Sequence, residues 1–136
     1  MRIKRASVLQ VPLLLCLIWI MAGCAGAGRT EKVSLSEQGK RSVTVEASSF
    51  KFEPSVIEVP RGDALTLKIM NVASVSHNFT IKDPQDRILR TVDLPPGETV
   101  TVEVPVNKAG TYEFYCDKPL HAALGMKGKI EVKSSP

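Results

Sequence analysis

The sequence contains little histidine and little cysteine: two histidines and three cysteines occur among its 136 residues. Two histidines are too few for two separate multi-histidine copper centres, which excludes an oxidase or nitrite reductase that needs a second such centre within this chain. Histidine-rich and methionine-rich tracts, which would favour a metal-delivery protein, are also missing. Long apolar runs are equally scarce, with one near the N-terminus and none after it.

That apolar run covers residues 8–21 and is shorter than the roughly 20 residues that a membrane-spanning helix needs. Basic residues precede it, namely Arg2, Lys4 and Arg5, and small residues follow it at Ala22 and Gly23. A basic start, an apolar middle and small residues at the end are typical of a secretory signal peptide. The sequence therefore predicts a signal peptide over residues 1–23 and an exported domain.

The junction at Cys24 resembles the cleavage site of bacterial lipoproteins, in which the cysteine becomes the first residue and carries the lipid. This resemblance implies lipid attachment at Cys24 and a membrane anchor on the periplasmic or cell-surface side. Residues 24–42 are mostly small and polar, so we expect a flexible tether there. Two alternatives are cleavage at a small residue such as Ala25 or Ala27, without lipid, and an uncleaved anchor; all three export the domain.

Removal of the signal peptide changes the number of free cysteines and the net charge of the protein. Cys16 lies in the signal and Cys24 is the lipid site, which leaves Cys116 alone and excludes an intrachain disulfide. An unpaired cysteine in an exported protein indicates a reactive thiol or a metal ligand. Lysine plus arginine falls from 18 to 15 against 14 aspartates and glutamates, so the net charge falls from +4 to about +1. We expect no nucleic-acid partner from such a balance.

Short stretches of alternating apolar and polar residues begin at residue 42, and no later segment has a strong helical period. We expect about eight short strands among the segments 43–47, 50–53, 56–59, 64–72, 78–82, 88–94, 100–104, 111–116 and 128–132. Proline and glycine lie between many of them, as in turns. The pattern predicts an all-β Greek-key β-sandwich formed by residues 43–136.

Four residues with metal-binding side chains form the most informative pattern. Cys116, His121 and Met126 are five residues apart within one loop, and His77 begins a strand far upstream. Taken singly, each has an ordinary alternative, such as a buried inert cysteine, a surface histidine or a methionine at the core edge. Together, two imidazoles, one thiolate and one thioether are the donor set of a blue-copper site, whereas structural zinc prefers four strong ligands. The sequence therefore predicts one copper ion.

Residues 43–133 resemble the cupredoxins, the small blue-copper proteins related to plastocyanin, azurin and auracyanin. The matching segments are 50–54, 57–63, 77–79, 110–116, 121 and 125–128. The Cys-x₄-His-x₄-Met spacing is most similar to that of the auracyanin-type members. The resemblance implies a short copper–sulfur bond from Cys116, imidazole ligands from His77 and His121, and a long axial contact from Met126. It also implies that Asn78 hydrogen-bonds near the cysteine sulfur and ties the two ligand segments together.

Position 120 departs from the family, because Leu120 stands where many relatives have glycine. A binuclear copper domain of the cytochrome oxidase type would need a second cysteine at this position, so the resemblance implies one copper ion. The resemblance also implies that partners dock on an apolar patch around His121, formed by Pro119, Leu120, Ala122 and Leu124. The alternative is that Leu120 and Leu124 close the end of the core.

The expected function is a membrane-tethered electron carrier, not an enzyme, that cycles between Cu(II) and Cu(I). Its expected partners are a redox protein that donates the electron and another that accepts it, and the expected state is a monomer. The alternative is a copper-binding module for copper delivery, storage or metal-centre assembly.

Overall fold

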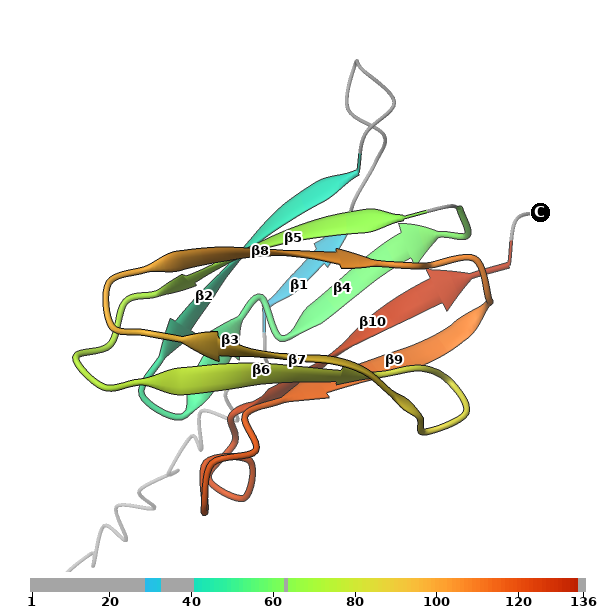
Figure 1. The fold of residues 1–136 in the computed structure, drawn as a ribbon. Helices are drawn as coiled ribbons and strands as arrows, with labels where there is room; N and C mark the ends of the chain where they lie inside the picture. The colour runs from blue at the N-terminus through green and yellow to red at the C-terminus, as the bar shows by residue number, and fades with distance from the viewer. Residues whose placement is uncertain (1–28, 33–40, 63, 135–136) are drawn as a thin grey trace, which may run out of the picture.

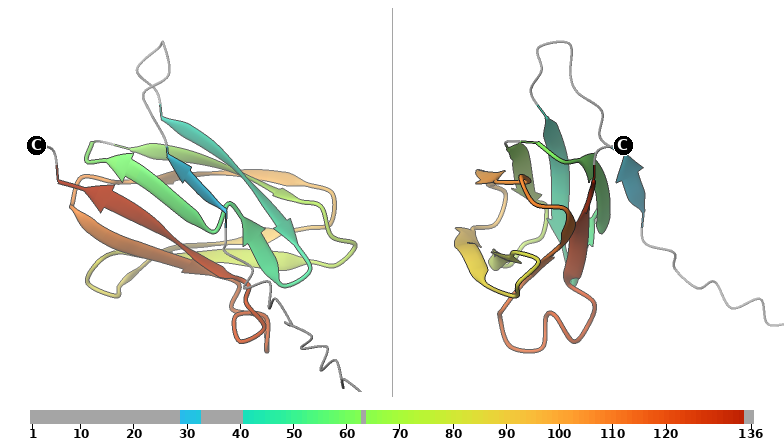
Figure 2. Two further views of the ribbon diagram at one scale, coloured as in Figure 1. Left: turned by 180° about the vertical axis from the view of Figure 1, so that it is seen from behind. Right: turned by 90° about the vertical axis from the view of Figure 1, so that its right-hand side faces the viewer.

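The computed structural model describes residues 29–32, 41–62 and 64–134, and these residues form ten strands in two facing sheets (Figures 1 and 2). The six-stranded sheet has the order β1 (Thr30–Lys32), β4 (Val56–Pro60), β10 (Lys127–Lys133), β9 (Gly110–Tyr115), β6 (His77–Lys82) and β7 (Ile88–Leu94). The four-stranded sheet has the order β3 (Lys51–Glu53), β2 (Ser42–Ser48), β5 (Leu65–Asn71) and β8 (Thr99–Val104). The predicted all-β sandwich is therefore confirmed. No helix long and apolar enough to span a membrane occurs in the described residues.

Strand β1 differs from the sequence prediction, which placed residues 24–42 in a flexible tether. Its three residues pair in parallel with β4, with Thr30 opposite Val56 and Lys32 opposite Glu58. The segment is short and polar, so it has no apolar alternation to mark it as a strand, and the unpaired edge of β4 supplies its hydrogen-bonding partner. The predicted signal peptide, Cys24 and residues 33–40 lie outside the described residues.

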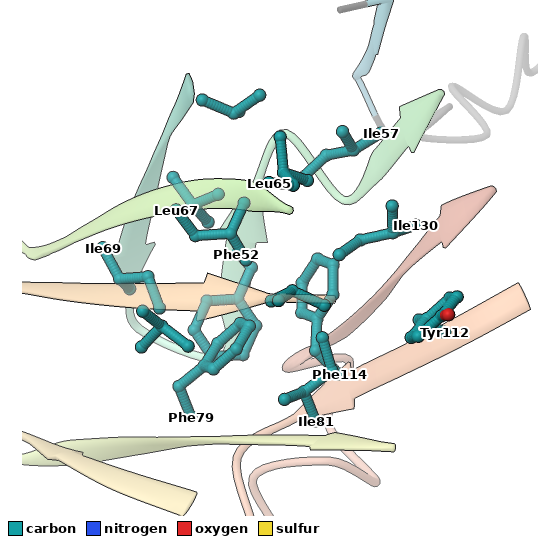
Figure 3. Packing of buried hydrophobic residues seen from close by; sticks show 14 of the residues in the cluster. Phe52, Ile57, Leu65, Leu67, Ile69, Phe79, Ile81, Tyr112, Phe114 and Ile130 are labelled. Atoms are coloured by element: carbon teal, nitrogen blue, oxygen red, sulfur yellow. The ribbon is translucent and has the colours of Figure 1, made fainter. Parts of the chain in front are cut away.

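Apolar side chains that alternate along the strands fill the space between the sheets. Three phenylalanines meet at its centre: Phe52 lies 5.7 Å from Phe79 and 5.5 Å from Phe114, and Phe79 lies 5.1 Å from Phe114, between ring centroids (Figure 3). Phe52 belongs to the four-stranded sheet and the other two to the six-stranded sheet. This aromatic contact fixes one sheet against the other close to the end that carries the metal-binding side chains.

The strand register brings the predicted ligands to one end of the sandwich. β9 and β10 are antiparallel, with Tyr115 opposite Lys127, so the loop 116–126 between them is held at both ends. β6 lies beside β9, with Thr80 opposite Tyr115, and therefore starts at the same end with His77. The loop 116–126 extends beyond the sheets at the bottom of Figure 1.

Candidate metal centre

The side chains of His77, Cys116 and His121 converge. Nδ1 of His77 lies 3.2 Å from Nδ1 of His121, which in turn lies 3.4 Å from Sγ of Cys116. Each of the three residues offers one ligand atom within 4.8 Å of the other two. His77 and Cys116 are fully buried, whereas His121 is partly exposed. One strand, β6, and the loop 116–126 therefore present three donors to a single point.

Backbone hydrogen bonds close the loop that carries Cys116, His121 and Met126. The N–H of Cys116 donates to the carbonyl of Met126 at 3.0 Å, and the N–H of Met126 donates to the carbonyl of His121 at 2.9 Å. The N–H of His121 donates to Lys118 at 3.1 Å, which tightens the turn before it. Met126 is fully buried at the neck of this loop, directly opposite Cys116. The structure thus places all four sequence-predicted residues at one site.

The donor atoms have the chemistry that a copper ion requires. Burial lowers the pKa of His77, and the nearby His121 and Lys118 lower it further, so its imidazole is neutral and carries a free lone pair at neutral pH. Nε2 of His77 is buried and has no hydrogen-bond partner within the described residues, so the ring interacts through Nδ1. Two imidazole nitrogens and a soft sulfur, with a buried thioether beside them, fit one copper ion.

Asn78 ties the two ligand-bearing segments together, as the sequence resemblance implies. Its Oδ1 accepts the backbone N–H of Asp117 at 2.8 Å, and its amide donates to the Asp117 carboxylate. The hydroxyl of Thr80 reaches the same carboxylate at 3.4 Å. The residue after Cys116 is therefore attached to the strand that begins with His77, and such contacts orient metal ligands. Sequence reasoning missed Asp117 and Thr80, since neither belongs to a metal-ligand motif.

Asn71 holds the segment that precedes His77 in place. It is fully buried at the end of β5, and its Nδ2 donates to the carbonyls of Val75 at 2.9 Å and Leu94 at 2.8 Å. Its Oδ1 accepts the N–H of Ala73 at 3.0 Å. These bonds fix the loop before His77 and join it to β7. An asparagine that ends an apolar strand was the available sequence signal, and it was not recognised.

Phe50 is a further residue at the site that sequence reasoning placed only within a strand. It lies in the turn between β2 and β3, and its ring is perpendicular to that of His121, with centroids 5.1 Å apart and planes at 87°. Its φ of 59° falls in the left-handed region. A bulky residue rarely adopts this conformation on its own, so tertiary contacts hold the turn around Phe50 in place.

Exposed leucines flank the partly exposed His121. Leu120 is 73% exposed and Leu124 is 59% exposed, so the alternative in which they close the end of the core is wrong. Pro119 is exposed beside them and Ala122 is partly buried. Leu120 has a φ of 68°, a conformation that glycine adopts without strain. The departure from the family pattern at this position therefore places a large apolar side chain on a left-handed backbone next to His121.

Comparisons with known proteins point to the same fold. The family described as Cupredoxin-like domain matches residues 13–132. Plastocyanin of Sambucus nigra is 34% identical over 99 residues, covering 64% of this chain and 92% of that protein. Cytochrome c oxidase subunit 2 of Thermus thermophilus is 33% identical over 95 residues, covering 68% of this chain and 65% of that protein. The solved structure of reduced auracyanin from Roseiflexus castenholzii matches the fold with a TM-score of 0.59 at 21% identity, covering 71% of this chain and 98% of that chain.

Proposed function

Because the chain belongs to the family of cupredoxin-like domains, we propose that it is a blue-copper protein that carries single electrons between redox proteins outside the cytoplasm. The observation that carries this proposal is the convergence of one ring nitrogen from each histidine and the Cys116 sulfur within 4.8 Å of one another. The similarity to plastocyanin supports it, because the match covers most of that protein.

In this proposal Cys116, His77 and His121 hold the copper ion, and Met126 supplies the weak fourth contact. The bound copper supplies a one-electron change between Cu(II) and Cu(I). The protein supplies a donor set fixed by packed strands and by the closed loop, so the donors keep their positions in both oxidation states. Asn78 contributes by holding Asp117, and with it the backbone of Cys116, against β6.

Electron transfer without substrate turnover is the activity that this donor set supports best. Both histidines of the chain take part in the one centre, which leaves no imidazole for a second copper centre. A binuclear centre of the cytochrome oxidase type would require cysteine at position 120, where the chain has leucine. We therefore propose one copper ion per chain and no enzymatic activity.

The proposed site of electron exchange is the patch of Pro119, Leu120, Ala122 and Leu124 around His121. The two leucines expose large apolar side chains beside a ligand that itself reaches the surface. Such a patch suits brief contact with another redox protein, because apolar surface favours association without a fixed network of ion pairs. The proposal includes a monomer, a lipid on Cys24, and donor and acceptor proteins on the same side of the membrane.

Absorption and electron paramagnetic resonance spectra of the exported protein with Cu(II) test the copper site. We expect an intense thiolate-to-copper band with a small copper hyperfine splitting, and loss of that band in Cys116→Ser. A pale spectrum with large splitting would mean that Cys116 is not a ligand and that the protein binds copper in another way. Rapid copper transfer to an acceptor protein would instead favour the alternative function of copper delivery or metal-centre assembly.

The lipid is tested separately by mass spectrometry of the mature N-terminus. A diacylated or triacylated Cys24 is the expected result. A first residue after position 24, or an unmodified Cys24, would remove the lipid anchor from the proposal and leave the copper site unaffected.

A further inference from the structure

The turn between β2 and β3 places an aromatic ring against one of the proposed copper ligands. Phe50 and His121 form a perpendicular ring pair with centroids 5.1 Å apart. This geometry is favourable for aromatic rings, because the positive edge of one ring meets the negative face of the other. Phe50 lies in a turn of the four-stranded sheet and His121 in a loop of the six-stranded sheet, so the contact joins the two sheets at the metal-binding end.

Phe50 adopts an unfavourable backbone conformation to make this contact. Its φ is 59°, which glycine adopts freely and a bulky residue does not, and its side chain is not needed in the core, because Phe50 is 41% exposed. The metal loop also meets the backbone of the turn: a Cβ atom on Gly125 would lie 3.5 Å from the carbonyl oxygen of Phe50. Strained residues persist where their surroundings fix them, and they are concentrated at functional sites.

Apart from its contact with Phe50, the His121 imidazole interacts with the other proposed ligands, including a ring pair with His77 whose centroids are 5.1 Å apart. Its Nδ1 lies close to His77 and Cys116, which are themselves proposed ligands. No hydrogen bond reaches the ring from any other described residue of the chain. Rotation of the ring about its Cβ–Cγ bond would turn Nδ1 away from the other two donors. The ring of Phe50 lies against the imidazole and opposes that rotation.

We propose that Phe50 is a positioning residue for His121, whose ring keeps Nδ1 of the imidazole directed at Cys116 and His77. The positioning is a property of the protein before any metal binds. Its consequence, slower loss of copper from the site, rests on the proposed function. Phe50 acts on the site only through its contact with the His121 ring.

Substitutions at position 50 separate the ring from the backbone of the turn. Phe50→Ala and Phe50→Leu remove the ring, and Leu retains most of the apolar volume. Phe50→Gly removes the ring and relieves the left-handed backbone, so it remains folded even if Phe50→Ala does not. Phe50→Trp retains an aromatic ring and should restore wild-type behaviour. Ile88→Ala is the matched control, because Ile88 is an exposed apolar residue at the start of β7, away from His121.

The first measurement follows the His121 ring in the metal-free protein by nuclear magnetic resonance. We expect cross-peaks between the Phe50 and His121 rings in the wild type, and broader or averaged His121 ring signals in Phe50→Ala, Phe50→Leu and Phe50→Gly. His121 signals that stay as sharp in these variants as in Ile88→Ala would overturn the proposal. This readout needs no copper, so it stands even if the proposed function fails.

The second measurement is the rate at which copper passes to an excess of chelator, followed by the decay of the visible band. Removal of the Phe50 ring should make the loss of copper roughly three- to tenfold faster, because the contact between the two rings is lost. Phe50→Trp and Ile88→Ala should lose copper at the wild-type rate. Equal rates in wild type, Phe50→Leu and Phe50→Gly would contradict the proposal. A wild type without a visible band would contradict the proposed function instead.

Discussion

The backbone N–H of Cys116 donates to the backbone carbonyl of Met126, with nitrogen and oxygen 3.0 Å apart. The loop that carries three of the proposed ligands is therefore closed by main-chain atoms and not by the ligand side chains. A side chain at the neck of the loop can be changed while the closure remains. This makes it possible to test the contribution of each donor without opening the loop.

Met126→Leu should retain a coloured copper site and raise its reduction potential. The thioether is a weak donor that favours Cu(II), and leucine replaces it with hydrocarbon of similar volume. The fold should tolerate the change, because a swap of Met for Leu in a core usually costs less than about 1.5 kcal/mol. Voltammetry and the visible spectrum measure the two effects. A lower potential, or a colourless protein, would show that Met126 has another role.

Leu120→Lys should slow electron self-exchange between Cu(I) and Cu(II) copies of the protein by about tenfold, equivalent to ~1.4 kcal/mol. The charge would lie in the apolar patch beside His121, where two copies must approach each other. The visible spectrum should be nearly unchanged, because the Leu120 side chain is 73% exposed. Line broadening in mixtures of the two oxidation states measures the rate.

Ile88→Lys is the control for that experiment. Ile88 is 61% exposed and starts β7, whereas Leu94 at the other end of β7 pairs with His77. The same charge is thus added at the opposite end of the sandwich. If both variants slow exchange equally, net charge and not the patch around His121 controls the approach.

Leu120→Gly should raise the free energy of unfolding by up to about 1 kcal/mol. The left-handed backbone at φ 68° costs leucine about 1–2 kcal/mol, and the greater freedom of glycine in the unfolded chain offsets part of the gain. Leu124→Gly removes the same side chain from the same loop and should instead lower stability. Urea unfolding of the metal-free proteins measures both. A loss of stability in Leu120→Gly would mean that the exposed leucine makes a stabilising contact.

Asp83→Asn should destabilise the protein at neutral pH and much less in acid. The Asp83 carboxylate accepts the backbone N–H groups of Gln85 at 2.9 Å and Arg87 at 3.0 Å, and Nε of Arg87 at 2.9 Å. The hydrogen bond from the Arg87 side chain is the main reason why the pKa of Asp83 is lowered to about 2. Since the folded pKa is the lower one, this stabilisation is complete above the unfolded pKa near 4 and disappears as the pH falls towards 2.

Urea unfolding of the metal-free protein from pH 7 down to pH 2 measures that dependence. The difference in the free energy of unfolding between wild type and Asp83→Asn should become smaller below pH 4. Asp86→Asn in the same turn is the control, because Asp86 is exposed and forms its ion pair with Lys82 at the surface. A constant difference between wild type and Asp83→Asn across the pH range would show that the charge of Asp83 is not what stabilises the turn.

The sequence predicted those parts of the structure that depend on local pattern and donor chemistry. Alternation located the strands of both sheets, such as Leu65–Asn71, and donor type together with spacing located the four proposed ligands. Contacts between the sheets were not predictable in this way. Phe50 is ordinary in sequence, and its place against His121 depends on how two distant turns meet. Asp117 was missed for the same reason, because its partner Asn78 is 39 residues away.

The pairing of β1 with β4 fixes where the N-terminal end of the described chain, Arg29, lies on the sandwich. The backbone of Ser55, beside the first residue of β4, donates to the carbonyl of Arg29 and accepts from Lys129 near the start of β10. Arg29 therefore lies at the end of the sandwich from which the loop 116–126 extends.

If Cys24 carries a lipid, five residue steps separate it from Arg29, and even a fully extended chain spans only about 18 Å over them. A glycine- and serine-rich segment inserted after position 25 should then let the protein in membrane vesicles exchange electrons with acceptors that the native chain cannot reach. If the insertion leaves this exchange unchanged, the short connection to Cys24 does not limit the reach of the domain. With the native length, a lipid on Cys24 would hold the end of the sandwich with the loop 116–126 close to the bilayer, and the proposed redox partners would have to lie at the lipid surface.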